Sequence, residues 1–210
     1  MSKQALVVVD VQNDFLPGGA LGIATGDEII PLINRLVLLP FDVRVASQDY
    51  HPEHHSSFAS TWGKKPGEHV VINGIVQTLW PDHCVQGTPG VEFSPQLDKK
   101  HFELVAHKGV NPEVDSYSIF FDSQKHRATG LDQFLQKHEI TDLYFAGLAT
   151  EYCVFYSVVD SIHLGFKPHV IIDACRGIDL APGDVEKAIT TMRELGAEIV
   201  TTEQVLKRIQ

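Results

Sequence analysis

Asp142-Leu-Tyr-Phe-Ala-Gly-Leu-Ala-Thr-Glu-Tyr-Cys153-Val154 is the segment from which the architecture of the chain can be worked out. An apolar strand pattern ends at Gly147 and a helical pattern begins near Thr150, which predicts a strand that leads directly into a helix. Cys153 is expected in the first turn of this helix, where unpaired N–H groups and the helix dipole favour an anion. We therefore predict a nucleophilic thiol with a lowered pKa at the edge of a sheet. The competing interpretation is a small buried apolar residue, which is what most free cysteines are.

Two further strand-like runs, at residues 5–10 and 102–108, each end in a charged residue. In an open parallel sheet, ligands bind beyond the carboxyl ends of the strands, so Asp10, Lys108 and Cys153 are expected to converge there. Asp10 could instead cap a helix, and Lys108 could form a surface salt bridge. The residues after Asp10 have no helical pattern, however, and a lysine that ends an apolar run is an unusual choice for a surface. We therefore favour one common site for the three side chains.

Strand-like runs alternate with helical patterns along most of the chain, and apolar strands joined by helices imply a parallel sheet covered on both faces. Strands are expected at residues 5–10, 43–47, 102–108, 142–147, 168–173 and 197–200, and helices at residues 27–37, 130–138, 150–163 and 184–195, before a short final helix. The predicted fold is a single-domain, Rossmann-like, three-layer α/β arrangement with an open, mainly parallel sheet of about six strands. We expect Asp27 to be the N-cap of the first helix, and Gly165 and Gly196 to end two later ones.

Composition narrows the range of functions. The chain has 210 residues, of which 43% are hydrophobic, and this suits one well-packed domain over residues 1–210. A formal charge of −10 argues against binding to nucleic acid phosphates. No apolar run approaches the roughly 18 residues that a membrane span needs, so we expect no membrane partner and a cytoplasmic protein. The three cysteines cannot all pair, which favours free thiols in a reducing compartment.

A second group of polar residues lies before and within residues 51–100, which show little periodicity. Long irregular segments of compact domains are usually functional. Asp49 and His51 are two residues apart, so in extended backbone their side chains leave on the same face and can share one ion. His83 can supply a third ligand, and one carboxylate with two imidazoles suits zinc, iron or manganese. Other nearby ligands rank lower because they break the extended alternation: His54, His55 and Cys84.

A series of ordered motifs runs almost from end to end of the chain. They are Val9-Asp10-Val11-Gln12-Asn13-Asp14-Phe15, Ser47-Gln48-Asp49-Tyr50-His51-Pro52, Trp80-Pro81-Asp82-His83-Cys84-Val85, His107-Lys108-Gly109, Asp115-Ser116-Tyr117-Ser118 and Gly147-Leu148-Ala149-Thr150-Glu151-Tyr152-Cys153-Val154. Together they resemble the nicotinamidase branch of the isochorismatase-like cysteine hydrolase superfamily. The Asp, Lys and Cys positions are shared by several amidases of the superfamily, whereas Asp-x-His with Trp-Pro-x-His-Cys is similar to nicotinamidases in particular.

The resemblance implies catalytic roles that agree with the convergence expected above. Asp10, Lys108 and Cys153 would form the catalytic triad. A cis peptide bond before Ala149 would turn the amides of Ala149 and Cys153 towards one oxyanion hole. Glu151 stands where many relatives carry aspartate, and we expect this difference to affect the turn and not the chemistry.

The resemblance also implies a metal site and a substrate pocket. Asp49, His51 and His83 would hold one divalent metal ion, with zinc favoured over iron and manganese, and the ion would meet the ring nitrogen of a pyridine substrate. Aromatic side chains would line the pocket for the ring: Phe15, Trp80 and Tyr117.

The implied activity is metal-dependent hydrolysis of nicotinamide to nicotinic acid and ammonia through a cysteine thioester, in pyridine nucleotide salvage for NAD biosynthesis. Nicotinamide would be the small-molecule substrate, pyrazinamide a side substrate, and a homo-oligomer is compatible with the family. One alternative is a related cysteine amidohydrolase of the superfamily that acts on another small amide or a carbamoyl compound. The other is a binding module that kept the pocket and lost turnover, and the intact triad argues against it.

Overall fold

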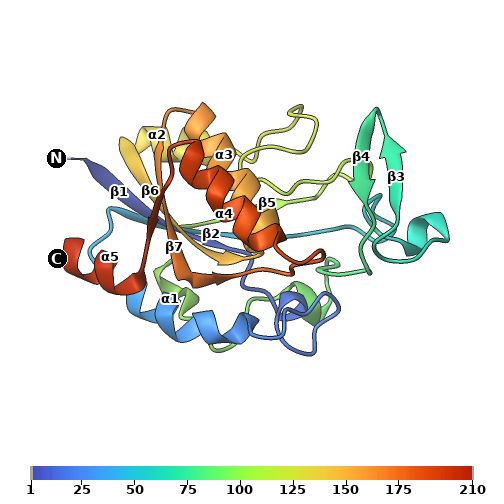
Figure 1. Cartoon of the computed structure of the whole chain (residues 1–210), viewed down its shortest axis with the longest axis horizontal. Coiled ribbons are helices and arrows are strands. Elements are labelled where there is room, and N and C mark those ends of the chain that lie inside the picture. Colours follow the sequence, from blue (N-terminus) through green and yellow to red (C-terminus); the bar gives the residue numbers. More distant parts are fainter. Residues whose placement is uncertain (1, 210) are drawn as a thin grey trace.

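The computed structural model describes residues 2–209 and contains a six-stranded parallel sheet in the order β5-β2-β1-β6-β7-β8 (Figure 1). The bounds of its strands are β1 Lys3–Val9, β2 Val43–Asp49, β5 Leu104–Lys108, β6 Ile140–Leu148, β7 Lys167–Arg176 and β8 Glu198–Val200. The predicted α/β class, the parallel sheet and the number of strands are confirmed. Each strand begins or ends within a few residues of the bounds expected from the apolar runs.

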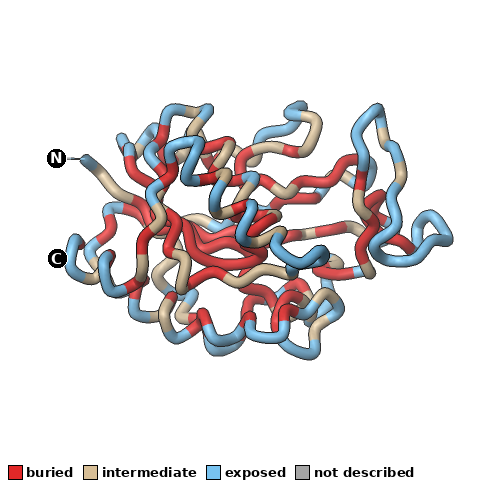
Figure 2. Tube along the Cα trace, in the orientation of Figure 1, coloured by how far each residue is buried: buried red, intermediate tan, exposed pale blue. Residues whose placement is uncertain are grey.

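Helices cover both faces of the sheet, as predicted (Figure 1). On one face lie α1 Ile30–Leu36 and α5 Thr202–Arg208, and on the other lie α2 Leu131–Lys137, α3 Phe155–His163 and α4 Asp184–Glu194. The central strands are therefore buried on both sides, and Figure 2 shows them as a continuous buried layer. Gly165 and Gly196 follow α3 and α4 with positive φ angles of 88° and 107°, which confirms the two predicted helix ends.

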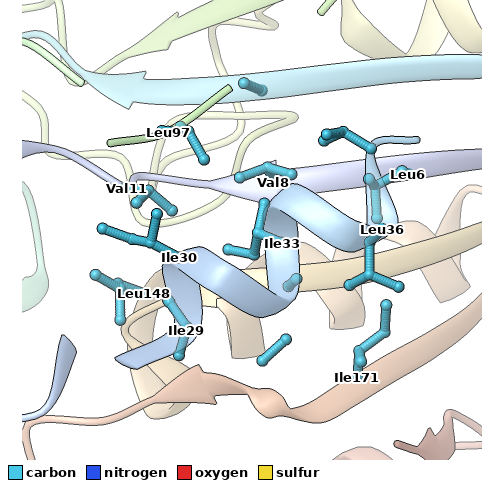
Figure 3. Close-up of a cluster of buried hydrophobic side chains, with 14 of the residues drawn as sticks. Leu6, Val8, Val11, Ile29, Ile30, Ile33, Leu36, Leu97, Leu148 and Ile171 are labelled. Atoms are coloured by element: carbon cyan, nitrogen blue, oxygen red, sulfur yellow. The ribbon is translucent and has the colours of Figure 1, made fainter. Parts of the chain in front are cut away.

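The first helix shows how the apolar spacing becomes packing. Ile30, Ile33 and Leu36 of α1 point towards the sheet and pack with Val8 of β1 and its neighbours (Figure 3). The prediction that Asp27 caps this helix was wrong. A short 3-10 helix, η2 Gly26–Ile29, leads into α1, so the α-helix starts from backbone that is already helical at Ile29 and uses no side-chain cap.

The irregular middle section contains a β-hairpin that the sequence did not predict, β3 His69–Ile72 paired with β4 Ile75–Thr78. It stands apart from the main sheet at the end of the molecule opposite the termini (Figure 1). Asn73 and Gly74 form its two-residue turn with positive φ angles of 51° and 82°, as an Asn-Gly hairpin turn requires. Each strand has only four residues, so the apolar runs of the hairpin, residues 70–72 and 75–76, are shorter than those by which the main strands were recognised.

Short helical turns make up much of the remaining chain. They are the 3-10 helices η1 Asn13–Phe15, η3 Ser60–Trp62, η4 Pro89–Val91 and η5 Lys99–His101, and the π-helix η6 Thr150–Val154 that precedes α3. No helix within residues 2–209 has both the length and the apolar character that crossing a membrane demands.

The strand order brings the ends of distant segments together. The chain moves outwards from β1 through β2 to β5 and then returns to the other side of β1 with β6, so β1 and β6 meet at the point where the strand order reverses. Gly147 near the end of β6 has a φ of 128°, and a Cβ there would collide with the backbone of Val9 in β1. This close approach sets Asp10, after β1, beside the turn that leads to Cys153.

Candidate active site

Lys108 is the centre of the candidate site. Its buried side chain comes from the carboxyl end of β5, where the register places it opposite Asp49 of β2. Its Nζ lies 2.8 Å from Asp10 Oδ2 and 2.5 Å from Asp49 Oδ1, and it donates a hydrogen bond to Cys153 Sγ at 3.2 Å. Burial lowers the pKa of Lys108, but Asp10, Asp49 and Cys153 outweigh it and hold the pKa well above its usual value. The structure thus brings together the acid, the lysine and the thiol that the strand ends predicted.

Asp10 lies immediately after β1 in left-handed backbone, with a φ of 50°. Its Oδ1 accepts a hydrogen bond from Ser47 Oγ at 2.7 Å, and Ser47 is in place because β2 aligns it opposite Val9. Its Oδ2 faces the Lys108 ammonium and makes no regular hydrogen bond within residues 2–209. Burial raises the pKa of Asp10, and Asp49 adds to this effect against the attraction of Lys108. A carboxyl group with a raised pKa is suited to take up and return a proton.

Cys153 lies in the π-helix η6, directly after the cis peptide bond between Leu148 and Ala149 that the resemblance implied. Burial raises the pKa of its thiol well above the usual value; Asp10 and Asp49 raise it further, and Lys108 opposes them without prevailing. The predicted lowering of this pKa was therefore wrong for the protein without a bound ion. Helix-end donors favour a thiolate, but two carboxylates and full burial favour the thiol. A neutral thiol needs a base, and Asp10 is the carboxyl group placed to serve as one.

Asp49, His51 and His83 form a group whose ligand atoms lie within 4.8 Å of one another. The Nδ1 atoms of His51 and His83 lie 2.9 Å and 2.8 Å from the carbonyl oxygens of Gly109 and Pro81. Because a carbonyl oxygen only accepts, both Nδ1 atoms carry the proton and both Nε2 atoms present a lone pair. Each Nε2 lies 3.7 Å from Asp49 Oδ2.

This spacing fits a shared metal ion. A separation of 3.7 Å is too long for a hydrogen bond, whereas two ligands held about 2.1 Å from one ion and about 120° apart lie about 3.6 Å from each other. Burial raises the pKa of Asp49, but Lys108 and then the two histidines outweigh it, and the pKa lies well below its usual value. One ionised carboxylate and two imidazole lone pairs in a buried cluster are a donor set for a divalent cation.

The alternative ligands occupy different positions. His54 is exposed, and Cys84 is a free, buried thiol packed in the apolar core on the α1 face. His55 is closer, because its ring stacks against that of His51 with centroids 4.2 Å apart, and it forms a second group with His51 and Asp115. Its Nδ1 is engaged by Ser57 Oγ at 2.7 Å. In the group formed by Asp49, His51 and His83, the carboxylate of Asp49 also contacts Lys108. Because Lys108 in turn contacts the thiol of Cys153, this group lies next to the thiol.

A pocket opens beside Cys153 and contains all three aromatic residues that the resemblance implied. Its lining is made by Phe15, Leu21, Asp49, Trp80, His83, Asp115, Tyr117, Ala149, Tyr152, Cys153 and Ile178. Trp80 Nε1 donates a hydrogen bond to Tyr117 Oη at 3.0 Å, which fixes the two rings relative to each other. The thiol, two members of the metal-ligand group and the aromatic walls thus face one space.

Several residues at the pocket were not predicted from the sequence. Tyr152 is next to the predicted nucleophile, and Ile178 follows the carboxyl end of β7, so the strand-end argument could have found both. Gln77 gave no such signal, since it lies on the unpredicted hairpin. Its amide donates hydrogen bonds to Asp115 Oδ2 at 3.0 Å and to Tyr117 Oη at 3.2 Å. The hairpin therefore supports the pocket wall from outside the main sheet.

Comparison with known proteins agrees with this geometry. A nicotinamidase from Escherichia coli is 45% identical over 204 residues, which cover 96% of this chain and 96% of that protein. The solved structure of an Acinetobacter baumanii nicotinamidase and pyrazinamidase superimposes with a TM-score of 0.93 at 42% identity and covers 98% of this chain and 99% of that one. A pyrazinamidase from Pyrococcus horikoshii, solved in complex with zinc, has a TM-score of 0.78 at 35% identity over 95% of this chain and 99% of that one.

The family assignment rests on nearly the whole chain. The sequence profile of the isochorismatase domain matches residues 4–204, which include every strand end that carries a residue of the candidate site. The parallel sheet, the cis peptide bond before Ala149 and the contact between Lys108 and Cys153 belong to the same matched region. The chain therefore belongs to the isochorismatase domain family.

Proposed function

We propose that this protein is a nicotinamidase, which hydrolyses nicotinamide to nicotinic acid and ammonia. The observation that carries the proposal is the contact of one buried ammonium, that of Lys108, with the thiol of Cys153 and with both Asp10 and Asp49. It joins an amidase triad to a metal-ligand group at the wall of one aromatic pocket. The nicotinamidases from Escherichia coli and Acinetobacter baumanii support the proposal by their identity over nearly all of this chain.

In the first half of the reaction, Asp10 removes the proton of the Cys153 thiol, and the sulfur bonds to the carboxamide carbon while the carbonyl electrons move to oxygen. Lys108 stabilises the thiolate that forms. The amides of Ala149 and Cys153 are assigned to the oxyanion, and such donors contribute about 3 to 4 kcal/mol each in other hydrolases. The carbonyl then reforms, the carbon–nitrogen bond breaks, and Asp10 returns the proton to the departing nitrogen as ammonia leaves.

In the second half, the thioester between Cys153 and the nicotinoyl group reacts with water. Asp10 takes one proton from the water as its oxygen bonds to the carbonyl carbon. The carbon–sulfur bond breaks, the sulfur recovers the proton, and nicotinic acid is released. Asp10 thus acts twice as base and twice as acid, which its raised pKa supports.

Asp49, His51 and His83 are the proposed ligands of one divalent metal ion. When bound, such an ion supplies a Lewis acid that attracts the ring nitrogen of the substrate. We propose zinc, because a mixed carboxylate and imidazole set suits it and because the Pyrococcus horikoshii relative was solved with zinc. Iron and manganese are the alternatives.

The same features define the substrate class. Phe15, Trp80 and Tyr117 wall the pocket with flat side chains, which suits a planar ring. A productive ligand needs a ring nitrogen on the side of the metal-ligand group and a carboxamide at Cys153. Pyrazinamide has both, so we propose it as a second substrate.

The direct test measures ammonia release from nicotinamide by the purified protein before chelation, after chelation and after metal is restored. We expect release that falls on chelation and returns with zinc, and no release from the Cys153→Ala variant. Turnover by Cys153→Ala would remove the thiol from the mechanism. No release from the reduced, metal-loaded protein would show that the substrate is another small amide.

A further inference from the structure

The loop that follows β7 closes one side of the substrate pocket. Ile178 is the residue of this loop that lines the pocket, together with the aromatic side chains from other segments. The loop is not part of the sheet, because β7 ends at Arg176 and α4 begins at Asp184. Its position over the pocket must therefore be held by side-chain contacts.

Glu151 makes these contacts. Its Oε1 accepts hydrogen bonds from the backbone N–H groups of Ile178 at 2.7 Å and Asp179 at 2.6 Å. The side chain reaches the loop from η6, two residues before the nucleophile Cys153, and is 9% exposed. Hydrogen bonds from two adjacent N–H groups to one buried carboxylate are charge-assisted and hold the backbone strongly.

The backbone of the loop is shaped to receive this carboxylate. A Cβ on Gly177 would lie 2.2 Å from Val185 Cγ2 and 2.5 Å from Glu151 Oε2, so the glycine lets both side chains pack closely on the loop. Asp179, whose N–H donates to the same carboxylate through Oε1, lies in left-handed backbone with a φ of 55°. Oε2 itself is buried and has no hydrogen-bond partner among residues 2–209, so the attachment depends on Oε1 alone.

The other contacts of the loop lie further from the pocket. Asp179 Oδ1 accepts hydrogen bonds from Gly183 and Val185, and Asp184 Oδ2 accepts one from Ala181 at 3.0 Å. These bonds join the loop to the start of α4, whereas Ile178 packs against the apolar cluster on the α1 face and takes no part in them. Glu151 is therefore the attachment between the pocket side of the loop and the helix of the nucleophile.

We propose that Glu151 is a positioning residue that holds Ile178 against the ring of the bound substrate and so determines substrate affinity. The proposal rests on the proposed function, since the ring is that of nicotinamide. Glu151 does not line the pocket, and its effect passes through Ile178. Its removal should therefore weaken binding and raise KM, while kcat stays close to that of the wild type.

The experiment compares Glu151→Ala, Glu151→Gln and Ile178→Ala with a matched control, Asp184→Ala, which removes a different hydrogen bond from the same loop. Steady-state kinetics with nicotinamide give KM and kcat. Calorimetric binding of nicotinamide is measured with each change placed in the metal-loaded Cys153→Ala protein, which binds without turnover. Circular dichroism and thermal unfolding monitor the fold of every variant.

We expect Glu151→Ala and Ile178→Ala each to raise KM and weaken nicotinamide binding about tenfold, the lower end of what lost apolar pocket contacts do. The Glu151→Gln variant keeps an acceptor and should recover most of the affinity, and Asp184→Ala should bind as the unmodified protein does. The double variant Glu151→Ala/Ile178→Ala should be no weaker than either single variant, because both changes remove the same contact.

Three results would overturn the proposal: unchanged KM in Glu151→Ala, a fall of kcat as large as the rise in KM, or additive effects in the double variant. A merely structural role would lower the unfolding temperature and leave KM unchanged. If Glu151→Ala does not fold, Glu151→Gln and Ile178→Ala provide the test. Normal nicotinamide affinity in Ile178→Ala would show that the contact of Ile178 with the ring, on which the proposal depends, does not contribute to binding. Failure of the proposed function is distinct, because the Cys153→Ala parent would then not bind nicotinamide.

Discussion

At the scale of single residues, Lys108 determines the electrostatics of the candidate site. Its ammonium lies against two buried carboxylates, and their mutual attraction offsets the cost of removing all three groups from water. This balance leaves the Cys153 thiol protonated, so the predicted meeting of Asp10, Lys108 and Cys153 is confirmed, whereas the predicted lowering of the thiol pKa is not. The strand ends predict which residues meet. Their protonation depends on burial and on the distances to several charged groups, and no local motif contains this information.

The first prediction concerns the reactivity of Cys153 in the metal-free protein. Because the pKa of the thiol lies well above the ordinary value of about 8.5, its alkylation by iodoacetamide should still be accelerating above about pH 9. Mass spectrometry of the labelled peptides measures the rate at each pH. Cys84 and Cys175 are the internal controls and should stay unlabelled in the folded protein, since they are buried and do not line the pocket. A rate that levels off near pH 7 would contradict the raised pKa.

The second prediction concerns Asp10 as the proton carrier. Asp10→Asn keeps the shape of the side chain and the acceptor for Ser47 Oγ but cannot take a proton. We expect kcat/KM for nicotinamide to fall about 10²- to 10⁴-fold with little change in the circular dichroism spectrum. The measurement is steady-state ammonia release at neutral pH. A loss of less than tenfold would assign the proton transfer to another group.

At the scale of secondary-structure elements, the turns after the strands place the functional groups. Gly109 follows β5 with a φ of 64°, and its carbonyl oxygen accepts from His51 Nδ1 at 2.9 Å. A Cβ on Gly109 would lie 2.5 Å from that nitrogen, so the ring of His51 packs directly on the glycine. The motif around Lys108 thus also orients His51, the proposed metal ligand in the turn that follows β2.

The third prediction follows from this packing. Gly109→Ala should displace the His51 ring and weaken metal binding about 10- to 100-fold, the effect typical of a residue that orients a ligand. Gly130→Ala is the matched control, because Gly130 has a φ of 86° and open space around its Cβ position. Metal content after competition with a chelator gives the affinity of both variants. Equal retention of metal would show that His51 does not depend on Gly109.

The hairpin shows the limit of sequence patterns at the same scale. Gln77 of β4 donates to Asp115 and Tyr117 across the pocket wall. The hairpin was not predicted, although apolar runs at residues 70–72 and 75–76 flank its turn. The Asn-Gly pair at its turn was a further indication. Contacts between an exposed hairpin and a pocket are tertiary and could not be predicted from local sequence.

For the whole molecule, the apolar strands and the helical spacing predicted the architecture. A sheet that is buried on both faces needs apolar strands and needs helices with an apolar side to cover them. The central strand β1 has no exposed residue from Ala5 to Val9, and the two apolar clusters on either side of it each require a layer of helices. The strand order, by contrast, depends on how distant segments pair. It was the order that brought Lys108 next to Asp49 and placed Cys153 beside Asp10.

The fourth prediction belongs to this scale, since metal binding should stabilise the entire fold. The proposed ligands come from β2 and from two loops that fold around its end, so the unfolded chain lacks the site. Metal at 100 times its Kd should raise the unfolding temperature by about 5 to 11 °C for a chain of this size. Calorimetry of the chelated and zinc-loaded protein measures the shift, and Asp49→Ala should show almost none. A shift of equal size in Asp49→Ala would place the ion elsewhere.

Residues 10, 108 and 153 come from three segments that are far apart along the chain: the residue after β1, the last residue of β5 and the helix after β6. A fragment that stops before Cys153, or one that begins after Asp10, cannot contain the complete proposed catalytic group. Cleavage in the connection between β5 and α2 would leave two pieces, one with the acid and the lysine and one with the thiol, and each would be inert alone. Ammonia release would then appear only where the pieces reassemble, so the chain is suited to use as a split reporter of association between two proteins fused to its halves.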